Sequence, residues 1–148
     1  MRYPRGTGPN SNVDKDLKPL KIGEANIINE ESSEIVILNF GTLLNEANQI
    51  SKELKATLVD MRFVKPLDEK LLRKLFKKAK VFISIEDGSI MGGAGSAVQE
   101  FASKENLNVR SILFGIPDKF IEHASREEML VEAGLDVENI KSKLSKLL

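Results

Sequence analysis

The pattern of apolar and polar residues changes near residue 24. Residues 1–23 contain a cluster of glycine, proline and asparagine and few apolar residues, a composition typical of a linker. From residue 24 onward, short apolar runs alternate with segments in which apolar residues recur every three or four positions. The short runs predict strands buried on both faces, and the longer segments predict amphipathic helices. We therefore predict one folded domain, residues 24–148, that follows a linker.

Five short runs are predicted to form one sheet. The runs are residues 25–29, 35–40, 57–61, 81–85 and 109–114. The last four alternate with helices, which favours parallel strands, right-handed crossovers and helices on both faces of the sheet. The first run is expected to be an antiparallel partner of the second, through a turn at 30–33. The predicted fold class is α/β: a three-layer sandwich whose mostly parallel five-stranded sheet has one antiparallel edge strand.

Several residues are placed to begin or end the predicted helices. Thr42, Asp68 and Asp136 are each expected to cap the start of a helix. Ser125 opens the capping-box sequence Ser-Arg-Glu-Glu, and Gly134 is expected to end the helix that follows it.

Composition narrows the possible functions. The 148 residues include 22 basic and 22 acidic side chains, so no net positive charge attracts nucleic acid or anionic lipid. Cysteine is absent and histidine occurs once, which excludes disulfides, thiolate nucleophiles and multi-histidine zinc sites. No apolar run is long enough to span a membrane, and the N-terminal residues lack the apolar core of a signal peptide. We expect a cytoplasmic protein with no nucleic-acid or membrane partner.

A glycine-rich segment is the first candidate for ligand binding. Gly92, Gly93 and Gly95 lie between a predicted strand and a helix, where backbone N–H groups can hold an anion. The dinucleotide fingerprint is incomplete because Val98 stands at its third glycine position, and no Gly-Lys-Ser/Thr of a phosphate loop is present. The residues favour a tight turn and close contact between helix and sheet over an anion site.

Two adjacent carboxylates precede the glycines. Glu86 and Asp87 are candidates for acid–base chemistry or for Mg²⁺ binding. Neighbouring side chains point in different directions, so the two need not share a site. Capping of a helix or loop is the favoured interpretation of both residues.

Basic residues offer a second type of candidate. Arg62 and Lys65 could bind a phosphate or an acidic surface, but pairing with a nearby aspartate is favoured. The available aspartates are Asp60 and Asp68. The lysines and arginine within residues 70–80 make one helix face basic, and a solvated face is favoured over nucleic-acid contact.

The remaining candidates are the single histidine and the N-terminal arginines. His123 lies near Asp118 and Glu122, but no nucleophile with its own base is visible, so a structural or solvated role is favoured. Arg2 and Arg5 offer forked donors that suit a phosphate, but on these residues alone a frayed terminus is favoured.

Several longer motifs, in the same order and spacing, carry a family resemblance. They are Arg-Tyr-Pro-Arg-Gly at 2–6, Leu-Asn-Phe-Gly-Thr-Leu at 38–43, Val-Asp-Met-Arg-Phe-Val-Lys-Pro-Leu-Asp at 59–68, Ile-Met-Gly-Gly-Ala-Gly-Ser-Ala-Val at 90–98 and Gly-Ile-Pro-Asp at 115–118. Together they closely resemble the 1-deoxy-D-xylulose-5-phosphate synthase family over essentially the whole chain.

The resemblance implies that this chain is similar to the last quarter of that enzyme. Residues 1–23 would be the end of its pyrimidine-binding domain plus a linker, and residues 24–148 its transketolase-like C-terminal domain. The family condenses pyruvate with glyceraldehyde 3-phosphate, with loss of CO₂, using thiamine diphosphate and Mg²⁺. Its product enters isoprenoid, thiamine and pyridoxal biosynthesis.

The resemblance also implies what this chain does not carry. The family's cofactor and metal sites belong to its other domains, so no catalytic, cofactor-binding or metal-binding residue is expected here. The chain alone is expected to be inactive and to bind no cofactor, with an architectural and dimer-forming role beside the remaining domains. One site residue carries over: Arg5 is similar to the family's ligand for the aldehyde phosphate.

Two departures from the family's pattern fall at Glu86-Asp87-Gly88 and His123-Ala124, where Glu-Glu-Asn and His-Gly are frequent. Two other functions remain open. One is a regulatory module that binds an anion or nucleotide through the glycine segment and Arg62. The other is the C-terminal part of another transketolase-like enzyme, such as a 2-oxoacid dehydrogenase β subunit.

Overall fold

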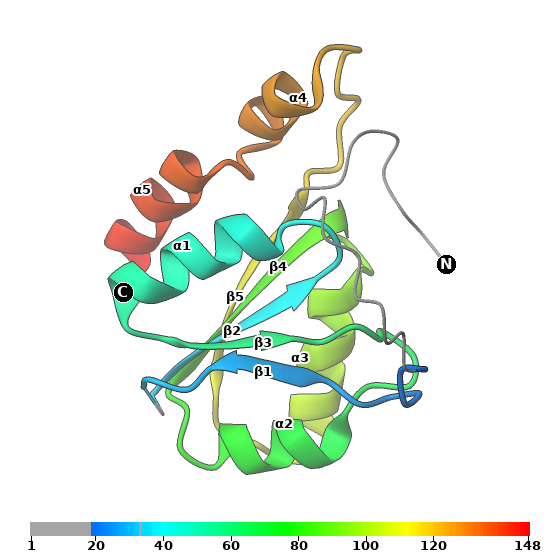
Figure 1. Cartoon of the computed structure of the whole chain (residues 1–148), viewed down its shortest axis with the longest axis vertical. Helices are drawn as coiled ribbons and strands as arrows, with labels where there is room; N and C mark the ends of the chain where they lie inside the picture. Colours follow the sequence, from blue (N-terminus) through cyan, green and yellow to red (C-terminus); the bar gives the residue numbers. More distant parts are fainter. Residues whose placement is uncertain (1–18, 33) are drawn as a thin grey trace.

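The computed structural model describes residues 19–32 and 34–148, which form one sheet covered by helices (Figure 1). The strands are β1 (Asn26–Asn29), β2 (Ile35–Phe40), β3 (Thr57–Asp60), β4 (Val81–Ser89) and β5 (Arg110–Ile116). The helices are α1 (Leu44–Leu54), α2 (Glu69–Phe76), α3 (Ala94–Lys104), α4 (Arg126–Ala133) and α5 (Val137–Leu147).

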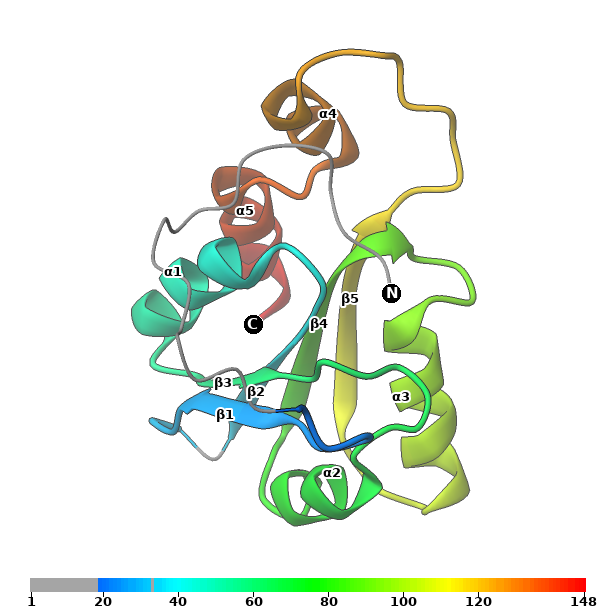
Figure 2. The ribbon, with the colours of Figure 1, turned by 45° about the vertical axis from the view of Figure 1, so that its right-hand side comes forward.

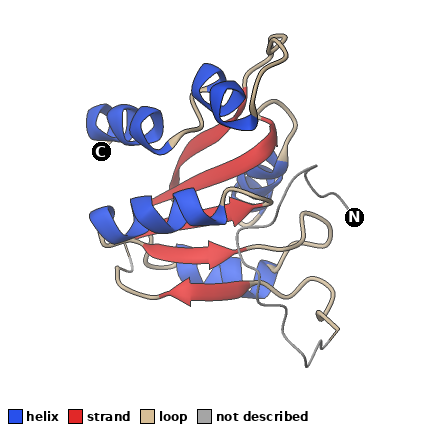
Figure 3. Ribbon diagram, turned by 45° about the horizontal axis from the view of Figure 1, so that its top comes forward, coloured by secondary structure: helices blue, strands red, loops and turns tan. Residues whose placement is uncertain are grey.

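The sheet has the strand order β1-β3-β2-β4-β5. Strands β2 to β5 run parallel to one another, and β1 lies at the edge of the sheet, antiparallel to β3. Helices α1 and α5 cover one face, and α2 and α3 cover the other (Figure 2). The α/β class, the three layers and the antiparallel edge strand are therefore confirmed, as the coloured layers of Figure 3 show.

One prediction about the sheet is wrong. Strand β1 pairs with β3, with Ile27 opposite Val59, and not with β2. Both edges of β2 are occupied by parallel neighbours, which excludes β1 from pairing with β2. The Asn29 side chain strengthens this pairing, because its Oδ1 accepts a hydrogen bond from the Leu58 N–H at 2.8 Å.

The strands of the sheet centre carry apolar side chains on both faces. Val36 and Leu38 belong to the core under α2 and α3, whereas Ile37 belongs to the core under α1 and α5. All three side chains are fully buried. This explains why the parallel strands appear in the sequence as continuous apolar runs and not as alternating patterns.

Most of the predicted helix boundaries are confirmed. The Asp68, Ser125 and Asp136 side chains each accept a hydrogen bond from a backbone N–H in the first turn of their helix. Gly134 ends α4 in the left-handed conformation, with φ of 69°.

The expected cap at Thr42 is wrong. Helix α1 has Leu43 at its N-cap position and no side-chain cap. The Thr42 hydroxyl instead donates to Asp87 Oδ2 at 2.7 Å, across the sheet. Thr42 therefore joins two strand ends and does not satisfy the start of its own helix.

Helix α3 begins on a buried carboxylate. Glu86, which is 5% exposed, accepts hydrogen bonds from the backbone N–H groups of Ala94 at 2.8 Å and Gly95 at 2.9 Å. A Cβ atom on Gly95 would lie 2.3 Å from Ser84 Oγ, and one on Gly93 would lie 2.0 Å from the Ser89 carbonyl oxygen. The glycines thus permit close contact between helix and sheet, as predicted, and Glu86 caps the helix.

We predict that Glu86→Gln destabilises the domain. The amide places a donor group where two backbone N–H groups need acceptors, so the free energy of unfolding should fall by about 1–3 kcal/mol. Chemical denaturation followed by circular dichroism measures this change. Glu100→Gln, at an exposed position of the same helix, is the control, and an equal loss in both variants would contradict the capping role.

Candidate functional site

The parallel strands bring four loops to one edge of the sheet, which we call the carboxyl edge. These loops are residues 41–43, 61–68, 90–93 and 117–125, which follow β2, β3, β4 and β5. In open α/β sheets, ligands bind in the crevice at this edge. The carboxyl edge is therefore where the candidate residues must be compared.

The glycine segment does not present an open anion site. The N–H groups of Ala94 and Gly95, which would face an anion at the start of α3, already donate to Glu86. The negative charge that suits a helix N-terminus is thus supplied by the chain itself. The structure supports the packing interpretation of this segment.

Asp87 does not contact the start of α3 as Glu86 does, but joins β4 to the turn after β2. Its Oδ2 accepts from the Thr42 hydroxyl at 2.7 Å and lies 3.4 Å from the Thr42 backbone nitrogen. Gly41 makes this approach possible: its φ is 94°, and a Cβ there would lie 2.3 Å from Asp87 Oδ1. Glu86 and Asp87 therefore serve different structural contacts and do not form a paired acid–base site.

Arg126 was not identified from the sequence, although it belongs to this cluster. Its Nη2 donates to Thr42 Oγ1 at 3.2 Å, and its Nη1 lies 3.8 Å from Glu46 Oε1. Thr42 and Arg126 are 84 positions apart, so no local pattern could have joined them. The contact connects α4 to the carboxyl edge through polar groups.

Arg62 follows β3 at the same edge. Its Nε lies 3.7 Å from Asp60 Oδ2, which confirms the predicted pairing with an aspartate. Its backbone is in the left-handed region, with φ of 57°. This conformation costs a non-glycine residue roughly 1–3 kcal/mol, and such costs tend to occur at functional positions. Lys65 is exposed in the same loop.

The other basic candidates have structural or solvated positions. Arg73 of α2 pairs with Glu105 and with Glu69, each at 2.7 Å. The hydrogen bond from Arg73 holds the pKa of Glu105 below its ordinary value. Lys80 pairs with Glu34 at 2.7 Å. These contacts support the predicted solvated face and not a nucleic-acid surface.

His123 is exposed on the loop between β5 and α4, which agrees with a solvated role. Arg5 and the other N-terminal candidates lie outside the described residues. In the part of the chain that the structure describes, no three His, Asp or Glu side chains gather as metal ligands would. Within residues 19–32 and 34–148, no helix has the length and apolar character needed to cross a membrane.

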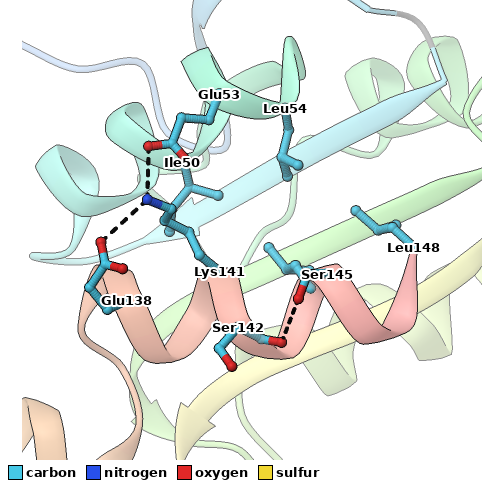
Figure 4. Close-up of a pocket in the computed structure, with 9 residues that line it drawn as sticks. Ile50, Glu53, Leu54, Glu138, Lys141, Ser142, Ser145 and Leu148 are labelled. Carbon is cyan, nitrogen blue, oxygen red and sulfur yellow. Dashed lines mark hydrogen bonds and ion pairs between the residues drawn. The ribbon is translucent and has the colours of Figure 1, made fainter.

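A hollow of about 450 Å³ lies between α1 and α5, away from the carboxyl edge (Figure 4). Lys141 reaches across it to Glu53 at 2.9 Å and to Glu138 at 3.3 Å. The hydrogen bond to Glu53, followed by that to Glu138, raises the pKa of Lys141 above its ordinary value. These paired charges tie the two helices together and leave no group that points to a ligand.

Comparison with known proteins identifies the family. The family model described as "Transketolase, C-terminal domain" matches residues 23–140. The 1-deoxy-D-xylulose-5-phosphate synthase of Stutzerimonas stutzeri is 49% identical over 100% of this chain, which spans 23% of that protein. The synthase of Pseudomonas aeruginosa is 47% identical over 95% of this chain, which spans 22% of that protein.

A solved structure has the same fold. A split-gene transketolase, described as an inactive β4 tetramer, superposes with a TM-score of 0.77 at 26% identity. The match covers 86% of this chain and 43% of that chain. This chain belongs to the transketolase C-terminal domain family and corresponds to the C-terminal part of 1-deoxy-D-xylulose-5-phosphate synthases.

Proposed function

We propose that this chain acts as the C-terminal domain of a 1-deoxy-D-xylulose-5-phosphate synthase. The observation that carries the proposal is the 44–49% identity to such synthases over nearly the whole chain. The likeness to the split-gene transketolase is lower, at 26% identity, which favours the synthase over another transketolase-like enzyme. The proposed reaction is the decarboxylating condensation of pyruvate with glyceraldehyde 3-phosphate in the bacterial cytoplasm.

The catalytic machinery is proposed to lie elsewhere in the assembled enzyme. The chain spans about a fifth to a quarter of the relatives it matches. In its described residues no three His, Asp or Glu side chains gather as ligands for a metal ion would. We assign residues 1–23 to the end of the pyrimidine-binding domain plus a linker, and residues 24–148 to the C-terminal domain. The remaining domains would hold the cofactor and complete a homodimer.

Two arginines are proposed to bind the aldehyde phosphate. Arg5 is assigned this role through the Arg-Tyr-Pro-Arg-Gly motif. Arg62 is added because the left-handed backbone after β3 holds it at the carboxyl edge. Among the described residues its one ion-pair partner is Asp60, at 3.7 Å, which is a weak pairing for a guanidinium. A phosphate could therefore engage Arg62 at little cost.

The regulatory-module alternative has less support. It depends on the N–H groups of the glycine segment, and Glu86 occupies two of them. An anion that took these N–H groups from Glu86 would leave the buried Glu86 carboxylate without hydrogen-bond partners, which costs about several kcal/mol. We therefore favour the synthase domain.

The first test replaces the matching part of the Stutzerimonas stutzeri synthase with this chain. This chimera should form 1-deoxy-D-xylulose 5-phosphate from pyruvate and glyceraldehyde 3-phosphate when thiamine diphosphate and Mg²⁺ are supplied. The isolated chain should form none under the same conditions, because it lacks the cofactor site. Product is measured by mass spectrometry. A folded chimera without activity would contradict the proposal, and so would product from the isolated chain.

The second test concerns Arg62 in the same chimera. Arg62→Ala should raise the KM for glyceraldehyde 3-phosphate roughly 10- to 100-fold, since a charge-assisted hydrogen bond contributes about 1.5–3 kcal/mol. The KM for pyruvate should change little, and Arg62→Lys should restore part of the loss. Arg110→Ala, at the opposite end of the sheet, is the control. Equal effects on both substrates would contradict a phosphate contact.

A further inference from the structure

One segment projects beyond the carboxyl edge and contacts the core through the partly buried Leu130 and Ala133 of α4. It consists of the loop 117–125 and α4, and we call residues 117–133 the arm (Figures 1 and 2). Phe120 on this loop is 99% exposed, the highest exposure among the large apolar side chains of the described residues. No residue of α4 is fully buried. A phenyl ring presents about 150–250 Å² of mostly apolar surface, so a fully exposed ring on a projecting loop is suited to making a contact.

The arm is held in shape by its own polar contacts. Lys119 Nζ lies 3.5 Å from Glu132 Oε1, which connects the loop to α4. The Ser125–Glu128 capping box fixes the start of α4, and the Ser125 hydrogen bonds hold the pKa of Glu128 below its ordinary value. Arg126 connects α4 to Thr42. Phe120 is thus presented on an ordered support, which lowers the entropy cost of binding.

The charge of the arm indicates the kind of surface to which it would bind. The arm contains five acidic residues and two basic residues. Both basic residues are already paired, Lys119 with Glu132 and Arg126 with Glu46. Asp118 and Glu122, on either side of Phe120 in the sequence, are exposed. The matching surface is an apolar pocket with lysine or arginine at its rim.

We propose that the arm inserts Phe120 into such a pocket on the catalytic part of the synthase, the part that precedes this domain in its relatives. This rests on the proposed function. That part makes up more than three quarters of each relative, so most of the surface that this domain could meet within such an enzyme belongs to it. Val64 and Met91, 47% and 68% exposed on the loops after β3 and β4, extend the apolar contact along the same edge. The arm thereby turns the carboxyl edge, with Arg62, toward the catalytic part.

Hydrogen exchange in the isolated chain and in the chimera described above tests the contact. Backbone amides of residues 118–122 should exchange at least about tenfold more slowly in the chimera, because docking removes them from solvent. Backbone amides in the last turn of α5, which is not part of the arm, serve as the internal reference. Equal exchange of residues 118–122 in the two proteins would overturn the proposal.

A pair of substitutions separates docking from folding. Phe120→Ala should leave the thermal unfolding of the isolated chain unchanged, because the side chain makes no core contact there. In the chimera it should restore fast exchange at 118–122, about tenfold or more, as expected for an interface anchor. Phe120→Leu should retain part of the protection. Leu148→Ala, an exposed apolar residue at the far end of α5, is the matched control and should have no effect on the arm.

Two other outcomes would count against the docking proposal, and a third would count against the proposed function alone. A concentration-dependent dimer of the isolated chain that Phe120→Ala abolishes would identify a second copy as the occupant. A chimera that does not unfold cooperatively would show that the surfaces do not fit. A protected arm in a folded but inactive chimera would retain the docking contact and reject the proposed function, so the two failures can be told apart.

Discussion

Four parallel strands that end at one edge of the sheet are the constraint on which this domain depends. Their direction brings the turns after β2, β3, β4 and β5 together, although these turns are far apart in the sequence. Burial of both sheet faces requires apolar strand interiors, so polar chemistry is confined to strand ends. Three polar side chains lie at this edge: Arg62, Asp87 and Arg126. The hollow between α1 and α5, in contrast, is bridged by the ion pair of Lys141 and Glu53.

The same edge shows how a side chain of the chain itself can occupy a position where an anion could bind. A glycine segment before a helix is suited to bind an anion, and here Glu86 provides the anion from within the chain. Gly93 and Gly95 then serve close packing, because a side chain at either position would collide with β4. The segment follows a strand and opens a helix, as a phosphate-binding segment does, but the N–H groups of Ala94 and Gly95 in its first turn already donate to Glu86.

Local patterns predicted the layers, most caps and the close packing at the glycines, because each depends on neighbours in sequence. The capping box at Ser125 and the cap at Asp68 are examples. The errors involve long-range competition. Thr42 is a good cap by residue type, but Asp87, 45 positions away, takes its hydroxyl. Strand β1 cannot pair with β2 because parallel neighbours occupy both edges of β2, which no turn sequence reveals. Arg126 was missed for the same reason.

The described residues combine a well-packed core with exposed groups at one edge, an arrangement that suits a domain of a larger enzyme. The core covers both sheet faces, with one cluster under α2 and α3 and the other under α1 and α5. Several exposed features, in contrast, lie at the carboxyl edge or on the arm: a guanidinium with one weak partner, apolar side chains on successive loops, and a projecting phenyl ring. Apolar groups supply the free energy of association, while a charged group held at the same edge can reach a shared substrate. Under the proposed function, the position of Arg62 next to exposed apolar side chains would make assembly and substrate binding depend on each other.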